Sequence, residues 1–297
     1  MSPGVKIEQI DWKFWAGFLC LLILGAGLRL LALTTGAINS LEVLSALAWL
    51  IGGFFIYTLS NQISSTMGAL ICLAYYYLLP LGIIVEKTDK TGSLIVVWLI
   101  LAIYGLYWLI KKRNLFWVVW VIVCLITLIL EFYLLEPLSI GSLGERMREI
   151  IKLILSPVFY LRWLEQLHGN LDLLLVLIGA AAIFLMSKPV RNFLLCIWLV
   201  YGITVLTFPA QAMNNDYFHQ LLIPIVAVSL GVFGDLSYRE ISKRGKVWQV
   251  LLLAVFVLAV LISTGYAGKR VLNAADLKAI LYPLKLSNFD GINLLWL

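Results

Sequence analysis

The feature that most constrains this chain is a succession of long, uninterrupted apolar runs. A bilayer core about 30 Å thick requires roughly 20 apolar residues for each helical crossing, and the sequence holds about nine runs of that size. Continuous runs exclude a transmembrane barrel, whose strands alternate apolar with polar residues. Helices satisfy their backbone hydrogen bonds internally, as lipid requires. We therefore expect an all-α integral membrane protein with helices over 13–33, 41–60, 66–85, 93–110, 115–135, 171–187, 193–208, 219–236 and 247–266.

The composition agrees with this class, because 62% of the residues are hydrophobic and 13% are charged, far from the balance of a soluble domain. The four cysteines all fall inside apolar runs, at Cys20, Cys72, Cys124 and Cys196. Within a span a cysteine acts as a small apolar residue, so we expect neither a disulfide nor a metal site. We expect one transmembrane domain over 1–266 and a short extracytoplasmic tail over 267–297.

The charges of the short loops predict the orientation, because Lys and Arg stay on the cytoplasmic side. Basic residues follow the fourth, sixth and eighth runs, which are alternate loops: Lys111, Lys112, Arg113, Lys188, Arg191, Arg239, Lys243, Arg244 and Lys246. In the intervening short loops, after the first, third and seventh runs, the only basic residues are Lys87 and Lys90. We expect an inside N-terminus and an outside C-terminus in the plasma (inner) membrane. The net charge of +6 then reflects topology and does not indicate nucleic-acid binding.

Ionisable residues gather on the side that this topology places outside the cell. They are Arg29, Glu42, Glu86, Asp89, Glu131, Glu136, Asp216 and His219. Each costs a few kcal/mol in lipid unless it faces a partner or a wet cavity. Taken singly, each is explained by a helix end that reaches the headgroups. As a set facing one leaflet, they indicate a cavity that opens there.

The long outer loop over 136–170 contains an amphipathic pattern at 143–155. Its apolar stripe is Leu143, Met147, Ile150, Ile151 and Ile154, opposite the charged residues Glu145, Arg146, Arg148, Glu149 and Lys152. This pattern is typical of a helix that lies flat in a membrane interface. Pro157 then ends it, and the chain returns to the sixth run. The helix is either a simple interfacial element or a lip over a lipid-linked substrate.

A polar stretch precedes the eighth run, NNDYFHQLLIP at 214–224. Its Asn-Asp-Tyr-Phe, followed by Pro224, resembles the His-Asp-Tyr-Tyr stretch and Leu/Pro-rich helix of membrane-embedded C-type glycosyltransferases, the protein O-mannosyltransferase and aminoarabinose transferase kind. Three further segments resemble core spans and an outer loop of that family: RNFLLCIWLVYGI at 191–203, the two runs over 41–83, and SPVFYLRWLEQL at 156–167.

Several features depart from that family pattern. The acid that the family commonly has after its third span aligns near Thr91 or Gly92, which leaves Asp89 displaced. Asn215 stands where the family has histidine. The loop between the first two runs, TTGAINSL, is short and contains no Asp, whereas the family usually keeps its catalytic acid in a large first outer loop.

The resemblance implies transfer of a sugar from a polyprenyl-phosphate donor to an acceptor at the outer leaflet. In such chemistry a carboxylate is the general base, and cationic or metal-assisted groups stabilise the departing phosphate. The carboxylates available for catalysis are Glu86, Asp89 and Glu42. The groups available to bind substrate and phosphate are Arg29, Arg146, Arg148, Arg162, Asp216, Tyr217 and His219. No cofactor is required by this pattern, and a divalent cation is compatible with it.

Two alternatives remain open at the level of sequence. The short first loop favours a truncated or degenerate scaffold without catalytic activity, or one that depends on a partner subunit for the missing loop. A transporter or flippase-like subunit of glycan assembly is the other alternative. Transporters often show paired halves with broken helices, and no repeat relates the Pro/Gly-containing third and eighth runs here.

Overall fold

All regular structure described for this chain is helical. The computed structural model describes residues 19–23, 26–27, 40–78, 92–135, 143–171, 173–214, 216–245, 247–248, 250–251, 254–255, 258 and 261. Within these residues no strand occurs, which confirms the all-α prediction. Four of the described helices are long and apolar enough to cross a membrane: Val43–Ile63, Leu94–Lys112, Lys188–Thr207 and Phe218–Ser242. These helices indicate a membrane protein.

The predicted runs coincide with helices where the structure describes them. The corresponding elements are α2 (Ser40–Ile63), α3 (Thr66–Leu78), α5 (Gly92–Lys112), α6 (Leu115–Leu135), α10 (Lys188–Thr207) and α12 (Leu222–Ser242). The first and ninth predicted runs fall largely outside the described residues, so the number of nine crossings stays a prediction.

The sixth predicted run departs from a simple span. It corresponds to α9 (Leu173–Ala182) and the short 3-10 helix η1 (Ile183–Leu185), preceded by α8 (Pro157–Leu171). The segments Pro157–His168 and Leu173–Leu185 meet at an angle of 98°. The chain is therefore sharply bent where it approaches this run.

The segment after the predicted amphipathic helix is also helical. Pro157 follows α7 (Leu143–Ile154), as predicted, but it also begins α8, because the first position of a helix requires no backbone N–H. Phe159, Leu167 and Leu171 are buried, and Trp163 between them is half-buried. This spacing of four residues forms one stripe on α8 that faces the rest of the protein.

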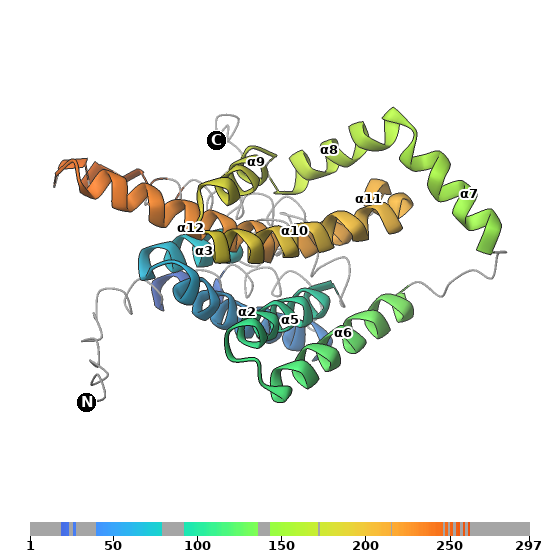
Figure 1. The fold of residues 1–297 in the computed structure, drawn as a ribbon, viewed down its shortest axis with the longest axis horizontal. Coiled ribbons are helices and arrows are strands. Elements are labelled where there is room, and N and C mark those ends of the chain that lie inside the picture. The colour runs from blue at the N-terminus through green and yellow to red at the C-terminus, as the bar shows by residue number, and fades with distance from the viewer. Residues whose placement is uncertain are drawn as a thin grey trace, which may run out of the picture.

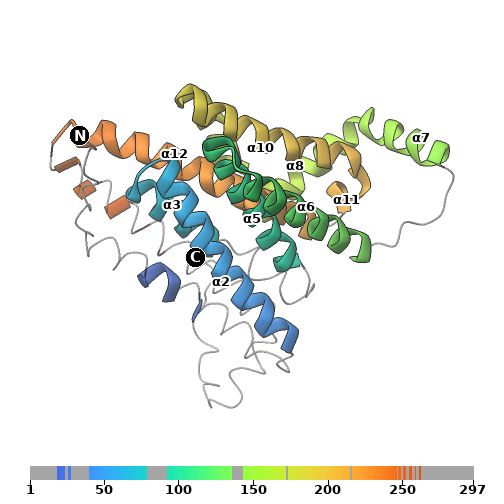
Figure 2. The same cartoon turned by 60° about the horizontal axis from the view of Figure 1, so that its bottom comes forward.

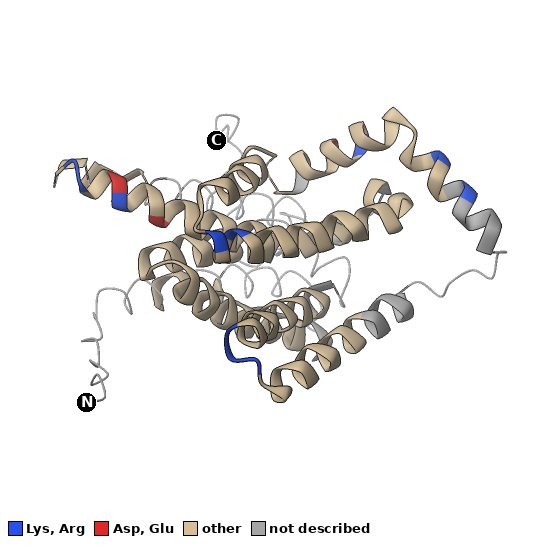
Figure 3. Ribbon diagram, in the orientation of Figure 1, with Lys and Arg blue, Asp and Glu red and all other residues tan. Residues whose placement is uncertain are grey.

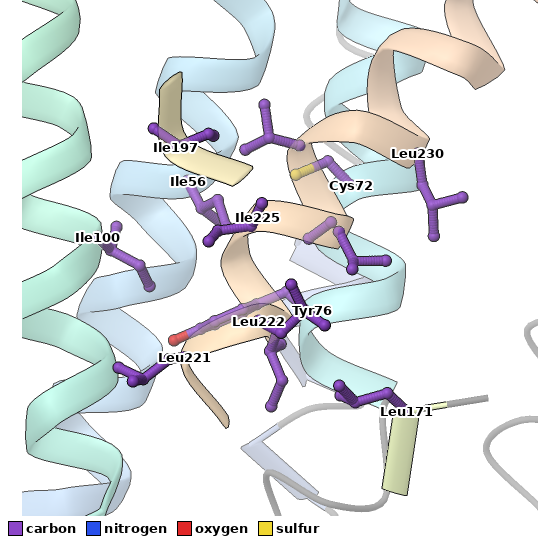
Figure 4. Packing of buried hydrophobic residues seen from close by; sticks show 14 of the residues in the cluster. Ile56, Cys72, Tyr76, Ile100, Leu171, Ile197, Leu221, Leu222, Ile225 and Leu230 are labelled. Carbon is purple, nitrogen blue, oxygen red and sulfur yellow. The ribbon is translucent and has the colours of Figure 1, made fainter. Parts of the chain in front are cut away.

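The helix α12 lies at the centre of the bundle, in contact with α2, α3, α9 and α10 (Figures 1 and 2). Of its apolar window 78% is buried, against 28% for α10. Side chains from five helices and η2 meet around it (Figure 4): Ile56, Cys72, Tyr76, Ile100, Leu171, Ile197, Leu221, Leu222, Ile225 and Leu230. The core therefore surrounds α12 and takes none of its buried residues from α6, which packs chiefly on α5.

Two consecutive tyrosines of α3 pack on two consecutive glycines of α2. The Tyr76 hydroxyl donates to the carbonyl of Trp49 at 3.2 Å, and the Tyr77 hydroxyl donates to the carbonyl of Leu50 at 2.9 Å. A Cβ at Gly52 would lie 2.6 Å from the Tyr76 hydroxyl oxygen. Glycine at this position lets the aromatic rings reach the backbone of the neighbouring helix, where hydroxyls find acceptors without water.

The charged residues separate toward two ends of the structure (Figure 3). Basic residues at the end of α5, the start of α10 and the end of α12 lie toward one end, at the left of the view. Those of α7 and α8 lie toward the opposite end, on an arm that extends beside the bundle (Figures 1 and 3). Between the two ends the helices expose large apolar side chains, including Leu44, Leu47, Ile51 and Phe54 on one face of α2.

Candidate functional site

The polar stretch that stood out in the sequence forms two short helices between α10 and α12. These are α11 (Pro209–Asn214) and the 3-10 helix η2 (Asp216–Leu221). Pro209 has no backbone N–H, so it cannot continue the hydrogen-bonding pattern of α10 and instead begins α11. The chain thereby reverses direction within a few residues and brings η2 against α5, α8 and α11.

His219 of η2 is fully buried, and both of its ring nitrogens are hydrogen-bonded. Nε2 lies 2.9 Å from the carbonyl oxygen of Ala212, and Nδ1 lies 3.2 Å from the hydroxyl oxygen of Tyr201. A carbonyl only accepts, so Nε2 carries the proton in this arrangement. In the neutral ring Nδ1 then accepts from the Tyr201 hydroxyl. Both ring nitrogens of His219 are therefore used in contacts that join η2 to α10 and α11.

The network continues from η2 to α8 through Tyr201 of α10. The indole Nε1–H of Trp163 donates to the Tyr201 hydroxyl oxygen at 3.4 Å, and Gln166 Nε2 donates to the carbonyl of Met213 at 3.5 Å. Trp163 and Phe159 also stack with ring centres 6.5 Å apart. These contacts tie α8 to α10, α11 and η2, so the four elements form one junction.

Gln220, the next residue of η2, is buried with 1% of its surface exposed. Neither its amide oxygen nor its amide nitrogen has a hydrogen-bond partner in the described part of the chain. A buried amide left unpaired costs about 1–3 kcal/mol. The junction therefore contains one side chain that a polar ligand would stabilise, beside a histidine that is already engaged.

The structure places some of the predicted site residues and leaves others undescribed. Arg148 of α7 and Arg162 of α8 are exposed on the arm, and His219 is buried in the junction. The backbones of four others lie in helices whose side chains at these positions are not described: Glu42 in α2, Arg146 in α7, and Asp216 and Tyr217 in η2. Arg29, Glu86 and Asp89 lie outside the described residues.

Several residues of the junction were not predicted from the sequence: Tyr201, Gln166 and Gln220. The signal that could have found Tyr201 is its position inside an apolar run, where a hydroxyl requires an acceptor. Trp198, which lies in the segment 191–203 that resembles the family, donates to the Ser229 hydroxyl of α12 at 3.0 Å and joins two helices. Its observed role is therefore structural.

The chain matches no protein-family model, no curated protein and no solved structure. In the described ranges no group of three or more His, Cys, Asp or Glu side chains is placed to hold a metal ion.

Proposed function

We propose that the chain is an integral membrane protein of nine crossings that binds a polyprenyl-phosphate-linked sugar at its extracytoplasmic side and transfers the sugar to an acceptor. In this proposal the N-terminus is cytoplasmic and the C-terminus is extracytoplasmic. The helix α7 lies in the membrane interface on the extracytoplasmic side. The basic residues at the end of α5, the start of α10 and the end of α12 support this orientation, because they lie toward one end of the structure, as cytoplasmic loops should (Figure 3).

The observation that carries the proposal is the position of the α7–α8 arm. Three exposed cations lie on it, Arg148, Lys152 and Arg162, and α8 contacts both η2 and α11. Exposed guanidinium groups suit a phosphate, because they donate two parallel hydrogen bonds to its oxygens. The buried amide of Gln220 below the arm is a side chain of the type that pairs with a sugar hydroxyl, since it both donates and accepts.

The proposed reaction requires a base, a nucleophile and a leaving group. A carboxylate takes the proton of the acceptor hydroxyl, whose oxygen attacks the anomeric carbon of the sugar. The bond from that carbon to the phosphate oxygen breaks, and the polyprenyl phosphate leaves with the electron pair, stabilised by the arginines. Glu86, Asp89 and Glu42 are the proposed bases. His219 is assigned a positioning role, because both of its nitrogens are engaged.

A second candidate function is a non-catalytic subunit that binds the same lipid-linked sugar, as a scaffold or a flippase-like component of glycan assembly. The bonds of His219 to Ala212 and Tyr201 favour it, because they use the buried imidazole to join helices. Binding without transfer is the property that separates this function from the first.

The experiment measures binding and transfer with the full chain in lipid nanodiscs. A radiolabelled polyprenyl-phosphate monosaccharide should bind saturably, and the Arg148→Gln/Arg162→Gln double variant should bind about tenfold more weakly. The control is Arg239→Gln/Arg244→Gln, which removes the same charge at the opposite end of the bundle and should leave binding unchanged. Transfer that is lost in Glu86→Gln or Asp89→Asn, with binding retained, supports the enzyme. Binding with no transfer in the native chain supports the second function, and no saturable binding rejects both.

A further inference from the structure

Basic and aromatic side chains gather around the turn that joins α5 to α6. Lys111 Nζ lies 5.5 Å from the ring centre of Tyr107 and 5.1 Å from that of Trp108, and Lys112 Nζ lies 4.5 Å from that of Trp108. Trp108 in turn stacks on Trp117 of α6, with ring centres 6.0 Å apart. An aromatic face holds a cation without neutralising it. Two ammonium groups are therefore presented at the end of this helix pair.

Arg113 continues the cationic group from an unfavourable backbone conformation. Its φ of 49° lies in the left-handed region, at the position after a helix where glycine is favoured. The turn is well formed, because the Arg113 N–H donates to the Leu109 carbonyl and the Asn114 side chain accepts from the Phe116 N–H. The Arg113 side chain is exposed and has no hydrogen bond or ion pair within the described ranges. Strain retained at an exposed arginine indicates a use for its charge.

Tertiary packing adds two more cations from a distant segment. The rings of Tyr107 in α5 and Phe193 in α10 lie with centres 5.7 Å apart, so the N-terminal part of α10 contacts α5 close to its basic end. The first turn of α10 carries Lys188 and Arg191. We call Lys111, Lys112, Arg113, Lys188 and Arg191 the turn cluster.

The turn cluster differs from the other basic segment at the same end of the structure. None of its five cations forms an ion pair with a described residue. On α12, by contrast, Arg239 Nη2 lies 2.8 Å from Asp235 Oδ2, and Lys243 Nζ lies 2.6 Å from Glu240 Oε1. The charge of the turn cluster is therefore available to an external anion, whereas part of the charge at the end of α12 is compensated.

The apolar surface next to the turn cluster is suited to contact the acyl chains of a lipid. Leu115, Phe116 and Val119 at the start of α6 are 75%, 57% and 53% exposed. The indole Nε1–H of Trp108 lies buried at the turn with no acceptor among the described residues. We propose that the turn cluster binds the headgroup phosphate of an anionic phospholipid, whose acyl chains lie along this face of α6. A zwitterionic phospholipid fits less well, because its own ammonium group repels the cluster.

The test uses the full chain, purified in detergent and delipidated, with bound lipid counted by native mass spectrometry during titration. The probes are phosphatidylglycerol and phosphatidylcholine. The site variant is the triple substitution Lys111→Gln, Lys112→Gln and Arg113→Gly. The matched control is Arg239→Gln, Lys243→Gln and Arg244→Gln, which removes three positive charges at the same end of the bundle.

The native chain should bind phosphatidylglycerol about tenfold more tightly than phosphatidylcholine, and the site variant should lose roughly tenfold in affinity while the control loses less than about twofold. Equal losses in both triple variants, or equal binding of the two lipids, would overturn the proposal. Competition by soluble glycerol phosphate as strong as that of the lipid would also overturn it, because the site would then be a simple anion site.

The single variant Arg113→Gly distinguishes a loss of binding from a loss of folding. Because glycine relieves the left-handed strain, this variant should unfold at the same temperature as the native chain or at a higher one. Its affinity for phosphatidylglycerol should nevertheless be lower than that of the native chain. Unchanged binding in this stable variant would contradict the use of the Arg113 charge.

Discussion

Gly68 of α3 and Gly231 of α12 lie directly against each other's backbone. A Cβ on Gly68 would lie 2.5 Å from the carbonyl oxygen of Gly231, and a Cβ on Gly231 would lie 2.7 Å from the carbonyl oxygen of Gly68. Lipid tails compete with apolar side chains for the same surface, so close backbone contact at small residues is a principal source of helix association in membranes. This contact fixes α3 on the central helix.

The first prediction concerns this contact. Gly231→Ala should destabilise the protein by about 1–3 kcal/mol, because the new methyl meets the Gly68 carbonyl oxygen, the Ser60 hydroxyl and the Cys72 Cβ, and the backbone oxygen cannot move aside easily. Thermal unfolding of the purified protein in detergent, followed by tryptophan fluorescence, measures this. Gly202→Ala in α10 is the control, since a Cβ there has nothing within 4 Å. Equal unfolding temperatures for the two variants would contradict the packing.

The second prediction concerns the junction of α8, α10 and η2. Tyr201→Phe removes the hydroxyl that accepts from Trp163 and is hydrogen-bonded to His219 Nδ1, while the ring remains. The expected loss is about 1–3 kcal/mol of unfolding free energy, the cost of breaking buried hydrogen bonds. Tyr160→Phe on the exposed side of α8 should change it by less than about 0.5 kcal/mol. Greater protease sensitivity of the α8 segment in Tyr201→Phe than in Tyr160→Phe would show that the destabilisation occurs at the junction that holds α8.

The third prediction compares the two ion pairs of α12. Asp235 is nearly buried, whereas Glu240 is largely exposed. Asp235→Asn should therefore lower stability by about 1–3 kcal/mol, because it removes the charge that pairs with Arg239 in a partly dry setting. Glu240→Gln should cost less than about 1 kcal/mol, as is usual for exposed pairs. Urea or thermal denaturation in detergent measures the stability of both variants. Equal losses of stability in Asp235→Asn and Glu240→Gln would show that burial of the carboxylate does not matter here.

The fourth prediction tests the orientation with the two ends of one helix. Ser187 precedes α10 and Ala210 follows it, and both are exposed. In a background with the four native cysteines replaced by alanine, Ser187→Cys should resist an impermeant thiol reagent in intact cells, and Ala210→Cys should react. Opening the cells should make Ser187→Cys reactive as well, which controls for accessibility. The reverse pattern would reverse the proposed topology.

The helical segments were predictable because their signal is local. A run of apolar residues in lipid must satisfy its own backbone, so α6 begins and ends at the predicted residues, Leu115 and Leu135. Other boundaries moved: α12 ends at Ser242, beyond the predicted 236. The helix α10 begins at Lys188, five residues before the predicted 193, because Pro189 fits the first turn of a helix.

The candidate site was predictable only in part. The stretch at 214–224 attracted attention through its polarity, and its histidine does lie in a buried polar junction. The partners of His219 come from α10 and α11. No spacing rule links Tyr201 to His219, because their approach depends on the reversal of the chain after Pro209.

By itself, the sequence determined that this chain is helical, where most helices lie and which ends carry positive charge. Only the tertiary structure decided which helix is central. The nearly uniformly apolar α6 is largely exposed in its described part. The helix α12 is largely buried, although it contains Ser229, Asp235 and two glycines. The reason is that a lipid tail and a neighbouring leucine are equally apolar, so hydropathy cannot distinguish them. Small residues that permit close approach, and polar groups that require partners, select the buried helix.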